Sequence, residues 1–182
     1  MSSSPADFNF IIRDATLADA AAIARVHVDA WRSTYAGIMP ADLLANLSYA
    51  ERESMWRSRL SRTDEAGVVL VVETSTGQLV GFAGAGPERT QRPDYPAEVW
   101  AIYLLEDVQG RGVGKALFKE AARRLQQLGF DSMLVWVAAA NPACGFYAAQ
   151  GGVLIDEKQE DFGGKAIQLV AYGWQRLDEL VA

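Results

Sequence analysis

A glycine-rich turn between a strand-like run and a helix-like run constrains the fold of this chain more than any other segment. The turn, Gln109-Gly-Arg-Gly-Val-Gly114, follows the apolar, β-forming run 98–105. It precedes the run 115–128, in which apolar residues recur at helical spacing, and Gly129 stands where a glycine commonly ends a helix. Such a turn exposes backbone N–H groups beside the positive end of the helix dipole. The segment therefore predicts a phosphorylated ligand.

Two common phosphate-binding motifs fail here at individual positions. A Walker A loop needs a glycine at 109, which is Gln109, and a Ser or Thr at 116, which is Ala116. The dinucleotide fingerprint, begun at Gly110, needs a glycine where the chain has Lys115. Binding of ATP or NAD is therefore disfavoured. The remaining alternative to a ligand site is an ordinary helix start.

The turn does fit the pattern Q/R-x-x-G-x-G/A, which resembles the pyrophosphate loop of the GNAT superfamily of acyl-CoA-dependent N-acetyltransferases. A second segment agrees with this resemblance. The apolar run 133–137 is followed by Asn141 and by a short helical run that carries the pair Phe146-Tyr147. This order is similar to the second cofactor element of the same family. The resemblance covers roughly residues 97–152.

The resemblance implies an α/β (α+β) fold with one mixed, mostly antiparallel sheet of about seven strands and helices on both faces. The cofactor cleft would lie between two diverging parallel central strands, 98–105 and 133–137. Local patterns predict the same order of elements along the chain. We expect strands at 10–13, 68–74, 79–83, 98–105, 133–137, 153–158 and 165–172, and helices at 20–36, 40–62, 115–128 and 142–150.

Length and composition predict one domain in a reducing compartment. The chain has 182 residues, half of them apolar, and we expect a flexible lead-in at 1–9 and a single N-acetyltransferase domain at 10–182. No apolar run reaches the ~18–20 residues of a membrane span, and 1–9 has no signal-peptide features. A lone cysteine, Cys144, cannot form an internal disulfide. These features predict a cytoplasmic protein without a membrane partner.

Charge and metal-ligand counts exclude two further classes. The net charge of −6 disfavours nonspecific nucleic-acid binding. A single histidine and a single cysteine rule out a His/Cys metal cluster, and nothing points to a carboxylate metal site. We therefore expect no nucleic acid and no metal.

The resemblance implies acetyl-CoA as the acyl donor and assigns residues to it. Main-chain groups of two strand residues would bond the pantetheine arm, and the glycine turn would hold the diphosphate. The assigned residues are Ile102, Leu104, Gln109, Gly110, Arg111, Gly112, Val113, Gly114, Lys115, Asn141 and Tyr147. Each assignment has a structural alternative: core packing for the strand residues, a solvated helix start for the basic side chains, and a helix N-cap for Asn141.

The resemblance also implies catalytic roles. Tyr147 is expected to protonate the departing thiolate, the alternative being that its ring only packs in the core. Glu98 is expected to remove the amine proton, directly or through water, the alternative being a solvated strand end. Trp31 and Tyr35 are expected to contact the acceptor, or else to be core aromatics.

Two remaining residues invite catalytic roles that the sequence does not support. His27, the single histidine, is expected to be an interior or interface residue. Cys144 has no evident base partner for an acyl-cysteine route.

The function implied is transfer of an acetyl group from acetyl-CoA to a primary amine by direct attack in a ternary complex. The alternative is a non-catalytic module that binds acyl-CoA as a sensor or for interaction. The acceptor, a small-molecule or peptide amine, is left open by the sequence. A homodimer is compatible with the resemblance.

Overall fold

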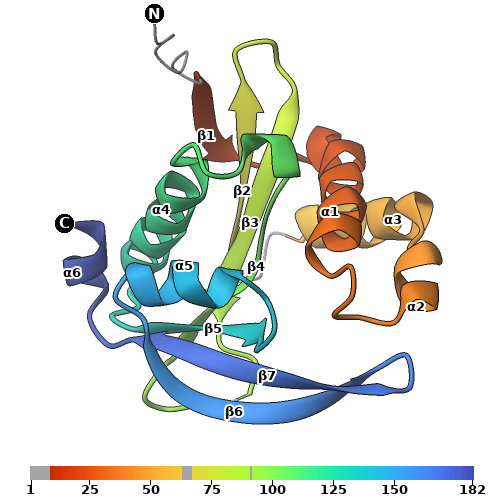
Figure 1. The fold of residues 1–182 in the computed structure, drawn as a ribbon. Coiled ribbons are helices and arrows are strands. Elements are labelled where there is room, and N and C mark those ends of the chain that lie inside the picture. The colour runs from red at the N-terminus through yellow and green to blue at the C-terminus, as the bar shows by residue number, and fades with distance from the viewer. Residues whose placement is uncertain (1–8, 63–66, 91) are drawn as a thin grey trace, which may run out of the picture.

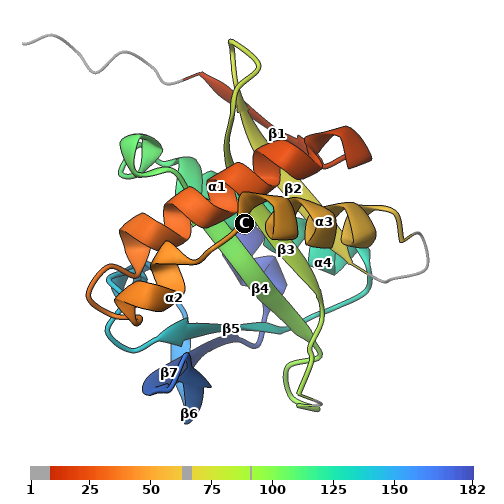
Figure 2. The same cartoon turned by 90° about the vertical axis from the view of Figure 1, so that its right-hand side faces the viewer.

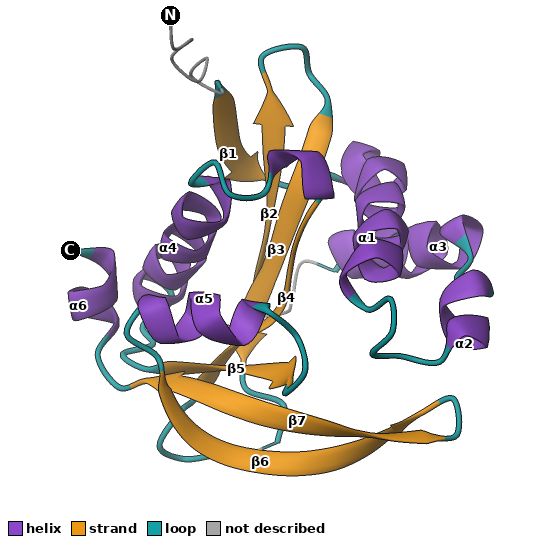
Figure 3. Ribbon diagram, in the orientation of Figure 1, coloured by secondary structure: helices purple, strands orange, loops and turns teal. Residues whose placement is uncertain are grey.

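In the part of the chain that the structure describes, seven strands form one sheet in which a single neighbouring pair, β4 and β5, is parallel. The computed structural model describes residues 9–62, 67–90 and 92–182, so most of the expected lead-in 1–9 lies outside the described residues. The strand order is β1-β2-β3-β4-β5-β7-β6 (Figures 1 and 3). The strands are β1 (Phe10–Asp14), β2 (Val68–Thr74), β3 (Leu79–Pro87), β4 (Ala97–Leu104), β5 (Met133–Ala138), β6 (Val153–Phe162) and β7 (Lys165–Trp174).

Helices lie on both sides of this sheet, as the resemblance predicted (Figures 1 and 2). They are α1 (Ala20–Thr34), α2 (Ala41–Ala45), α3 (Tyr49–Leu60), α4 (Val113–Gln127), α5 (Ala143–Ala149) and α6 (Leu177–Val181). The predicted fold class and order of elements are confirmed. Within the described residues, none of these helices has both the length and the apolar character needed to cross a membrane.

Two helix predictions need correction. The single helix expected over 40–62 is two helices, because the chain leaves α2 at Asn46 and restarts at Ser48. The side chain of Ser48 accepts a hydrogen bond from the N–H of Glu51 at 3.2 Å, which caps α3. The short helix α6 follows β7 and was not expected. Leu177 and Leu180 bury its apolar side.

The two faces of the sheet have separate apolar cores. Helix α4 packs one face, with Leu117, Phe118 and Leu125 fully buried against β-strand residues. Helices α1 and α3 pack the other, where Ile23 and Trp56 contact residues of β2 and β3. Apolar side chains recur along α1 and α4 at helical spacing, so each helix presents one continuous face to the sheet. The sheet thus separates an α4 side from an α1 side.

The parallel pair β4–β5 is short and ends abruptly. Register pairs join Ala97 to Met133 and Glu98 to Leu134, and the pairing stops there. One residue farther along, β4 carries a bulge: Val99 opposes Ala85 and Ala101 opposes Gly84, which leaves Trp100 as the extra residue. A bulge bends its strand and increases the local twist. β4 and β5 therefore diverge beyond Glu98, as predicted.

Gly84 makes room for this bulge. A Cβ atom at position 84 would overlap the Trp100 ring, so the indole lies directly over the glycine. The guanidinium carbon of Arg59 lies 3.7 Å from the centroid of the same ring, on the α3 side. Trp100 is thus fixed between β3 and α3, and the position of the bulge is fixed with it.

We expect Gly84→Ala to lower the free energy of unfolding by about 1–3 kcal/mol, because the new methyl group forces Trp100 away from β3. The control is Gly145→Ala in α5, where a Cβ atom would meet no atom within 4 Å. That change should be neutral or stabilising by up to about 1 kcal/mol. Urea unfolding of both variants measures the difference, and equal stabilities would contradict this account of the bulge.

Candidate active site

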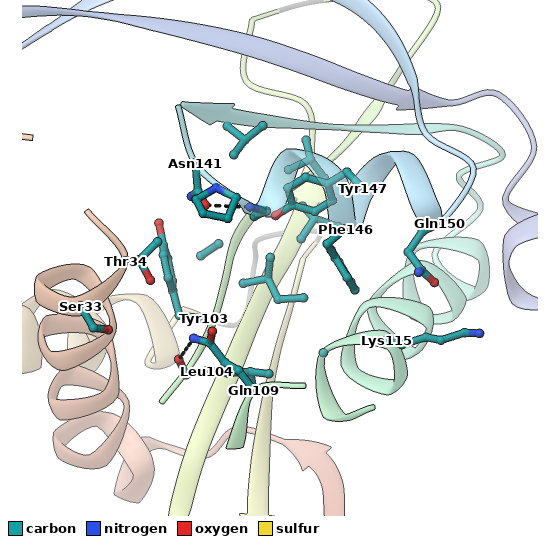
Figure 4. A pocket seen from close by; sticks show the side chains of 18 of the residues that line it. Ser33, Thr34, Tyr103, Leu104, Gln109, Lys115, Asn141, Phe146, Tyr147 and Gln150 are labelled. Atoms are coloured by element: carbon teal, nitrogen blue, oxygen red, sulfur yellow. Dashed lines mark hydrogen bonds between the residues drawn. The ribbon is translucent and has the colours of Figure 1, made fainter. Parts of the chain in front are cut away.

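A cavity of about 640 Å³ opens where β4 and β5 diverge. Its walls come from the end of α1, the outer half of β4, the glycine turn before α4, the middle of β5, and α5. Figure 4 shows the α1 residues Ser33 and Thr34 on one side and Lys115 of α4 on the other. The gap between the strands therefore joins the α1 side of the sheet to the α4 side.

The glycine turn has the backbone conformation that an anion site needs. Gly110 and Gly112 have φ angles of 72° and 81°, in the left-handed region that favours glycine. Helix α4 begins at Val113, and Ala116 donates to the carbonyl of Gly112 at 3.1 Å. The N–H groups of the preceding residues in the first turn have no acceptor within the helix. Nothing lies within 4 Å of a Cβ position at Gly112, so a ligand can approach the backbone there.

Most of the residues predicted for the cofactor meet in this cavity. Those that line it are Ile102, Leu104, Gln109, Gly110, Gly112, Gly114, Lys115, Asn141 and Tyr147. The side chain of Gln109 donates to the carbonyl of Leu104 at 3.1 Å and so ties the turn to the end of β4. Arg111 and Val113 are not among the lining residues, and the side chain of Val113 is fully buried in the core.

Two polar residues that line the cavity are Asn141, just before α5, and Tyr147, within it. Asn141 is buried and lines the cavity, and its Oδ1 accepts the N–H of Ala143, the first residue of α5, at 2.9 Å. The N-cap of α5 is Pro142, one residue after the position expected. The Tyr147 ring packs against Phe118 and Phe146. Within the described chain no residue forms a hydrogen bond with its hydroxyl. Burial raises the pKa of Tyr147, so the hydroxyl stays protonated at neutral pH.

The two faces of β4 contribute differently to the cavity. Ile102 and Leu104 belong to the core on the α4 side. Tyr103, which points to the opposite face, packs with the α1 side and lines the cavity. Its hydroxyl lies 3.4 Å from the hydroxyl of Tyr35, at the end of α1. Tyr103 was not among the predicted site residues. Because side chains alternate along a strand, its place between Ile102 and Leu104 already indicates that it points to the opposite face of β4.

Tyr35 lines the cavity as predicted for an acceptor contact, whereas Trp31 does not. The ring of Trp31 lies 4.9 Å from that of Tyr35, and both belong to one buried cluster. The alternative interpretation, a core aromatic, describes Trp31 in this structure. Cys144 also lies outside the cavity lining, and burial raises the pKa of its thiol.

Glu98 occupies an unexpected environment for the base predicted from the sequence. Its side chain is only 1% exposed, so the alternative of a solvated strand end is wrong. Both carboxylate oxygens accept hydrogen bonds from Arg89, from Nη2 at 2.6 Å and from Nε at 3.0 Å. Glu98 is not among the residues that line the cavity. Its role as a base stays a prediction.

His27 is an interior residue, as expected. Its Nδ1 accepts a hydrogen bond from the indole N–H of Trp56 at 3.2 Å, and its ring stacks on Tyr103 with centroids 5.5 Å apart. Burial, with a smaller contribution from the charge of Arg52, lowers the pKa of His27 to about 3. The imidazole is therefore neutral and links α3 to the cavity residue Tyr103.

Comparison with known proteins identifies the family. The model of the acetyltransferase (GNAT) family matches residues 26–151, which include the glycine turn and α5. The chain belongs to this family. The predicted family and the acyltransferase class are thereby confirmed.

Individual relatives agree with this assignment. The chain is 41% identical over 169 residues to the uncharacterized N-acetyltransferase YuaI of Bacillus subtilis (strain 168), covering 93% of this chain and 95% of that protein. It is 26% identical to the L-methionine sulfoximine/L-methionine sulfone acetyltransferase of Pseudomonas aeruginosa, with 72% and 73% covered. The fold matches the PaiA N-acetyltransferase of Thermoplasma acidophilum in complex with coenzyme A, at a TM-score of 0.66, 20% identity, and coverage of 89% and 98%.

We expect Gly112→Asp to weaken acetyl-CoA binding at least tenfold, because a carboxylate there would repel the diphosphate. The matched control is Gly129→Asp at the other end of α4. Both glycines have positive φ angles and nothing within 4 Å of a Cβ position, so both changes carry a similar backbone cost. Titration calorimetry should show loss of affinity for Gly112→Asp alone. Equal affinities in the two variants would contradict the assignment of the turn.

We expect the neutral, buried His27 to make stability depend on pH. An unfolded histidine binds its proton below about pH 6.5, whereas the folded one does so only near pH 3. The unfolded state therefore binds more protons in this interval, and His27 lowers the free energy of unfolding by up to about 1.4 kcal/mol per pH unit as the pH falls. His27→Gln should remove this component in urea unfolding between pH 7 and 4. Parallel pH profiles of the two proteins would contradict it.

Proposed function

We propose that this protein transfers the acetyl group of acetyl-CoA to a primary amine by direct attack, with both reactants bound in one cavity. The observation that carries the proposal is the continuity of that cavity across the sheet. It reaches from the glycine turn on the α4 side to the hydroxyl groups at the end of α1. A donor and an acceptor could therefore meet in the gap between β4 and β5.

The residues around the turn fit the donor. The first-turn N–H groups of α4, the side chain of Lys115 and the open approach at Gly112 suit a diphosphate. The outer half of β4 has no strand beside it on the β5 side, so its backbone groups are available to an extended pantetheine arm. One of these N–H groups, near Ile102, would polarise the thioester carbonyl.

The proposed transfer forms one bond, breaks one bond and moves two protons. The amine nitrogen forms a bond to the acetyl carbon, and the carbon–sulfur bond breaks. The nitrogen loses one proton and the sulfur gains one. Tyr147 is the proposed donor of that proton, because it lines the cavity with a hydroxyl that is protonated at neutral pH. A proton from solvent then restores its hydroxyl.

For the proton that leaves the amine, Glu98 remains the predicted base. Both oxygens of its carboxylate are occupied by hydrogen bonds from Arg89. Glu98 would have to act through water, or after Arg89 has moved, and the substrate amine would contact other groups first.

The acceptor is proposed to be a small-molecule or peptide amine. One relative, the P. aeruginosa enzyme named above, acts on L-methionine sulfoximine and L-methionine sulfone, which supports a small molecule. The single cysteine fits action in the reducing cytoplasm. A homodimer remains an expectation from the family resemblance.

We expect Tyr147→Phe to lower kcat by about 10²-fold or more while the Kd for acetyl-CoA changes less than twofold, because only a proton donor is removed. Tyr172→Phe is the control, since Tyr172 packs beside Tyr147 but does not line the cavity. Thiol release with a panel of amines gives kcat, and calorimetry gives Kd.

Two outcomes would overturn the proposal. Equal loss of kcat and of acetyl-CoA affinity in Tyr147→Phe would assign a packing role to the ring. Tight acetyl-CoA binding by the wild-type protein, without thiol release that any amine stimulates, would favour the alternative of a non-catalytic acyl-CoA module.

A further inference from the structure

We propose that the hydroxyl groups of Tyr103 and Tyr35 bind the amino group of the acceptor and aim its lone pair at the thioester. This inference rests on the acetyl transfer proposed above and names the residues that hold the second reactant. Neither residue belongs to the glycine turn or to α5, which carry the donor. Both lie on the α1 side of the sheet.

Tyr103 and Tyr35 line the part of the cavity that faces α1. Ile102 and Leu104 turn toward α4, the side of the sheet that carries the glycine turn proposed for the donor. Tyr103 turns the other way, and Figure 4 shows its ring on the opposite side of the cavity from the ring of Tyr147. Tyr35 reaches the same place from the end of α1. An acceptor that enters from the α1 side thus meets these two hydroxyls before it reaches Tyr147.

The two hydroxyl groups together can accept the hydrogen bonds of an amino group. Each hydroxyl has one donor and two acceptor lone pairs. When one of the two donates to the other across 3.4 Å, one O–H and three lone pairs remain, which a ligand shares with the neighbouring side chains of Asn141 at Tyr35 and Trp31 at Tyr103. An uncharged primary amine has two N–H donors and one lone pair. If tyrosine oxygens accept both N–H groups, the nitrogen lone pair is left free and points away from them, into the gap between the strands.

Neighbouring aromatic side chains hold both tyrosine rings in place. The His27 ring stacks nearly parallel on Tyr103, at an interplanar angle of 18°, and is itself held by the indole N–H of Trp56. Trp31 packs on Tyr35 with ring centroids 4.9 Å apart. These three aromatic side chains, His27, Trp56 and Trp31, fix both phenol rings, so the hydroxyls do not have to be ordered when the amine binds.

The charged residues among the described lining of the cavity lie away from the two tyrosines. Among the described residues that line the cavity, the charged ones are Glu106 and Lys115, and both belong to the segment around the glycine turn. Burial raises the pKa of both Tyr35 and Tyr103, so both are uncharged at neutral pH. The acceptor end of the cavity therefore offers neutral oxygen acceptors, which suit the unprotonated amine that the attack requires.

The experiment uses ethylamine, which carries nothing but an amino group and an ethyl chain, at pH 9. We expect Tyr103→Phe to raise the KM for ethylamine about tenfold, the effect of one hydrogen bond, and the double variant with Tyr35→Phe to raise it further. The Kd for acetyl-CoA should stay within twofold, because the pantetheine arm is proposed to bond the backbone of β4 and the diphosphate to bind the glycine turn, neither of which uses the Tyr103 hydroxyl. Tyr49→Phe is the control, since its hydroxyl bonds Asp29 outside the cavity.

A second measurement does not depend on turnover. Wild-type protein labelled with ¹³C at the tyrosine Cζ position is titrated with ethylamine in the presence of CoA, which cannot donate an acetyl group. The signals of Tyr103 and Tyr35, assigned from the two Phe variants, should shift while that of Tyr49 stays in place.

The outcomes separate this inference from the proposed function. Absence of shifts at both tyrosines, or an unchanged KM in the double variant, overturns the inference and leaves the acetyl transfer standing. A parallel loss of acetyl-CoA affinity in Tyr103→Phe also overturns it, because the ring would then only support the fold. Shifts in a protein that releases no thiol with any amine would support the amine site and reject the transfer.

Discussion

The early separation of β4 from β5 is the constraint on which the site depends. The two strands pair at Ala97–Met133 and Glu98–Leu134 and then part at the Trp100 bulge. Because Gly84 has no side chain, the Trp100 ring can lie flat on β3 and hold the bulge. Without this separation the sheet would be continuous, and the glycine turn on one face would have no route to the hydroxyl groups on the other.

The gap divides the chemistry between two faces. The α4 side offers backbone N–H groups, positive helix dipole and glycine access, which suit an anionic donor. The α1 side offers buried, uncharged tyrosine hydroxyls, which suit a neutral amine. Tyr147 lies where the two sides meet and keeps its proton because burial raises its pKa. One protein can thus hold a highly charged cofactor and an uncharged nucleophile a short distance apart.

The sequence predicted the parts of the site that local signals encode. The glycine turn, the helix that follows it and the short helix after Asn141 were predicted from short-range patterns, and the structure has all three. Prediction failed at two side-chain contacts that apolar periodicity does not reveal. The Arg89 partner of Glu98 comes from the irregular segment that follows β3, and the break between α2 and α3 depends on a cap at Ser48 within an otherwise helical pattern.

The sequence by itself determined the family, the order of the elements and the glycine turn before α4, because glycine conformations and apolar periodicity are properties of neighbouring residues. Only the tertiary structure decided which side chains share the cavity. Tyr35 and Tyr103 are 68 residues apart in the sequence, yet their hydroxyl groups lie side by side in the cavity. His27 of α1 and Trp56 of α3 are likewise joined by a hydrogen bond only because the two helices pack together. Their distances follow from how α1 and α3 pack on a bulged, twisted sheet, and such packing is set by the whole core rather than by any local pattern.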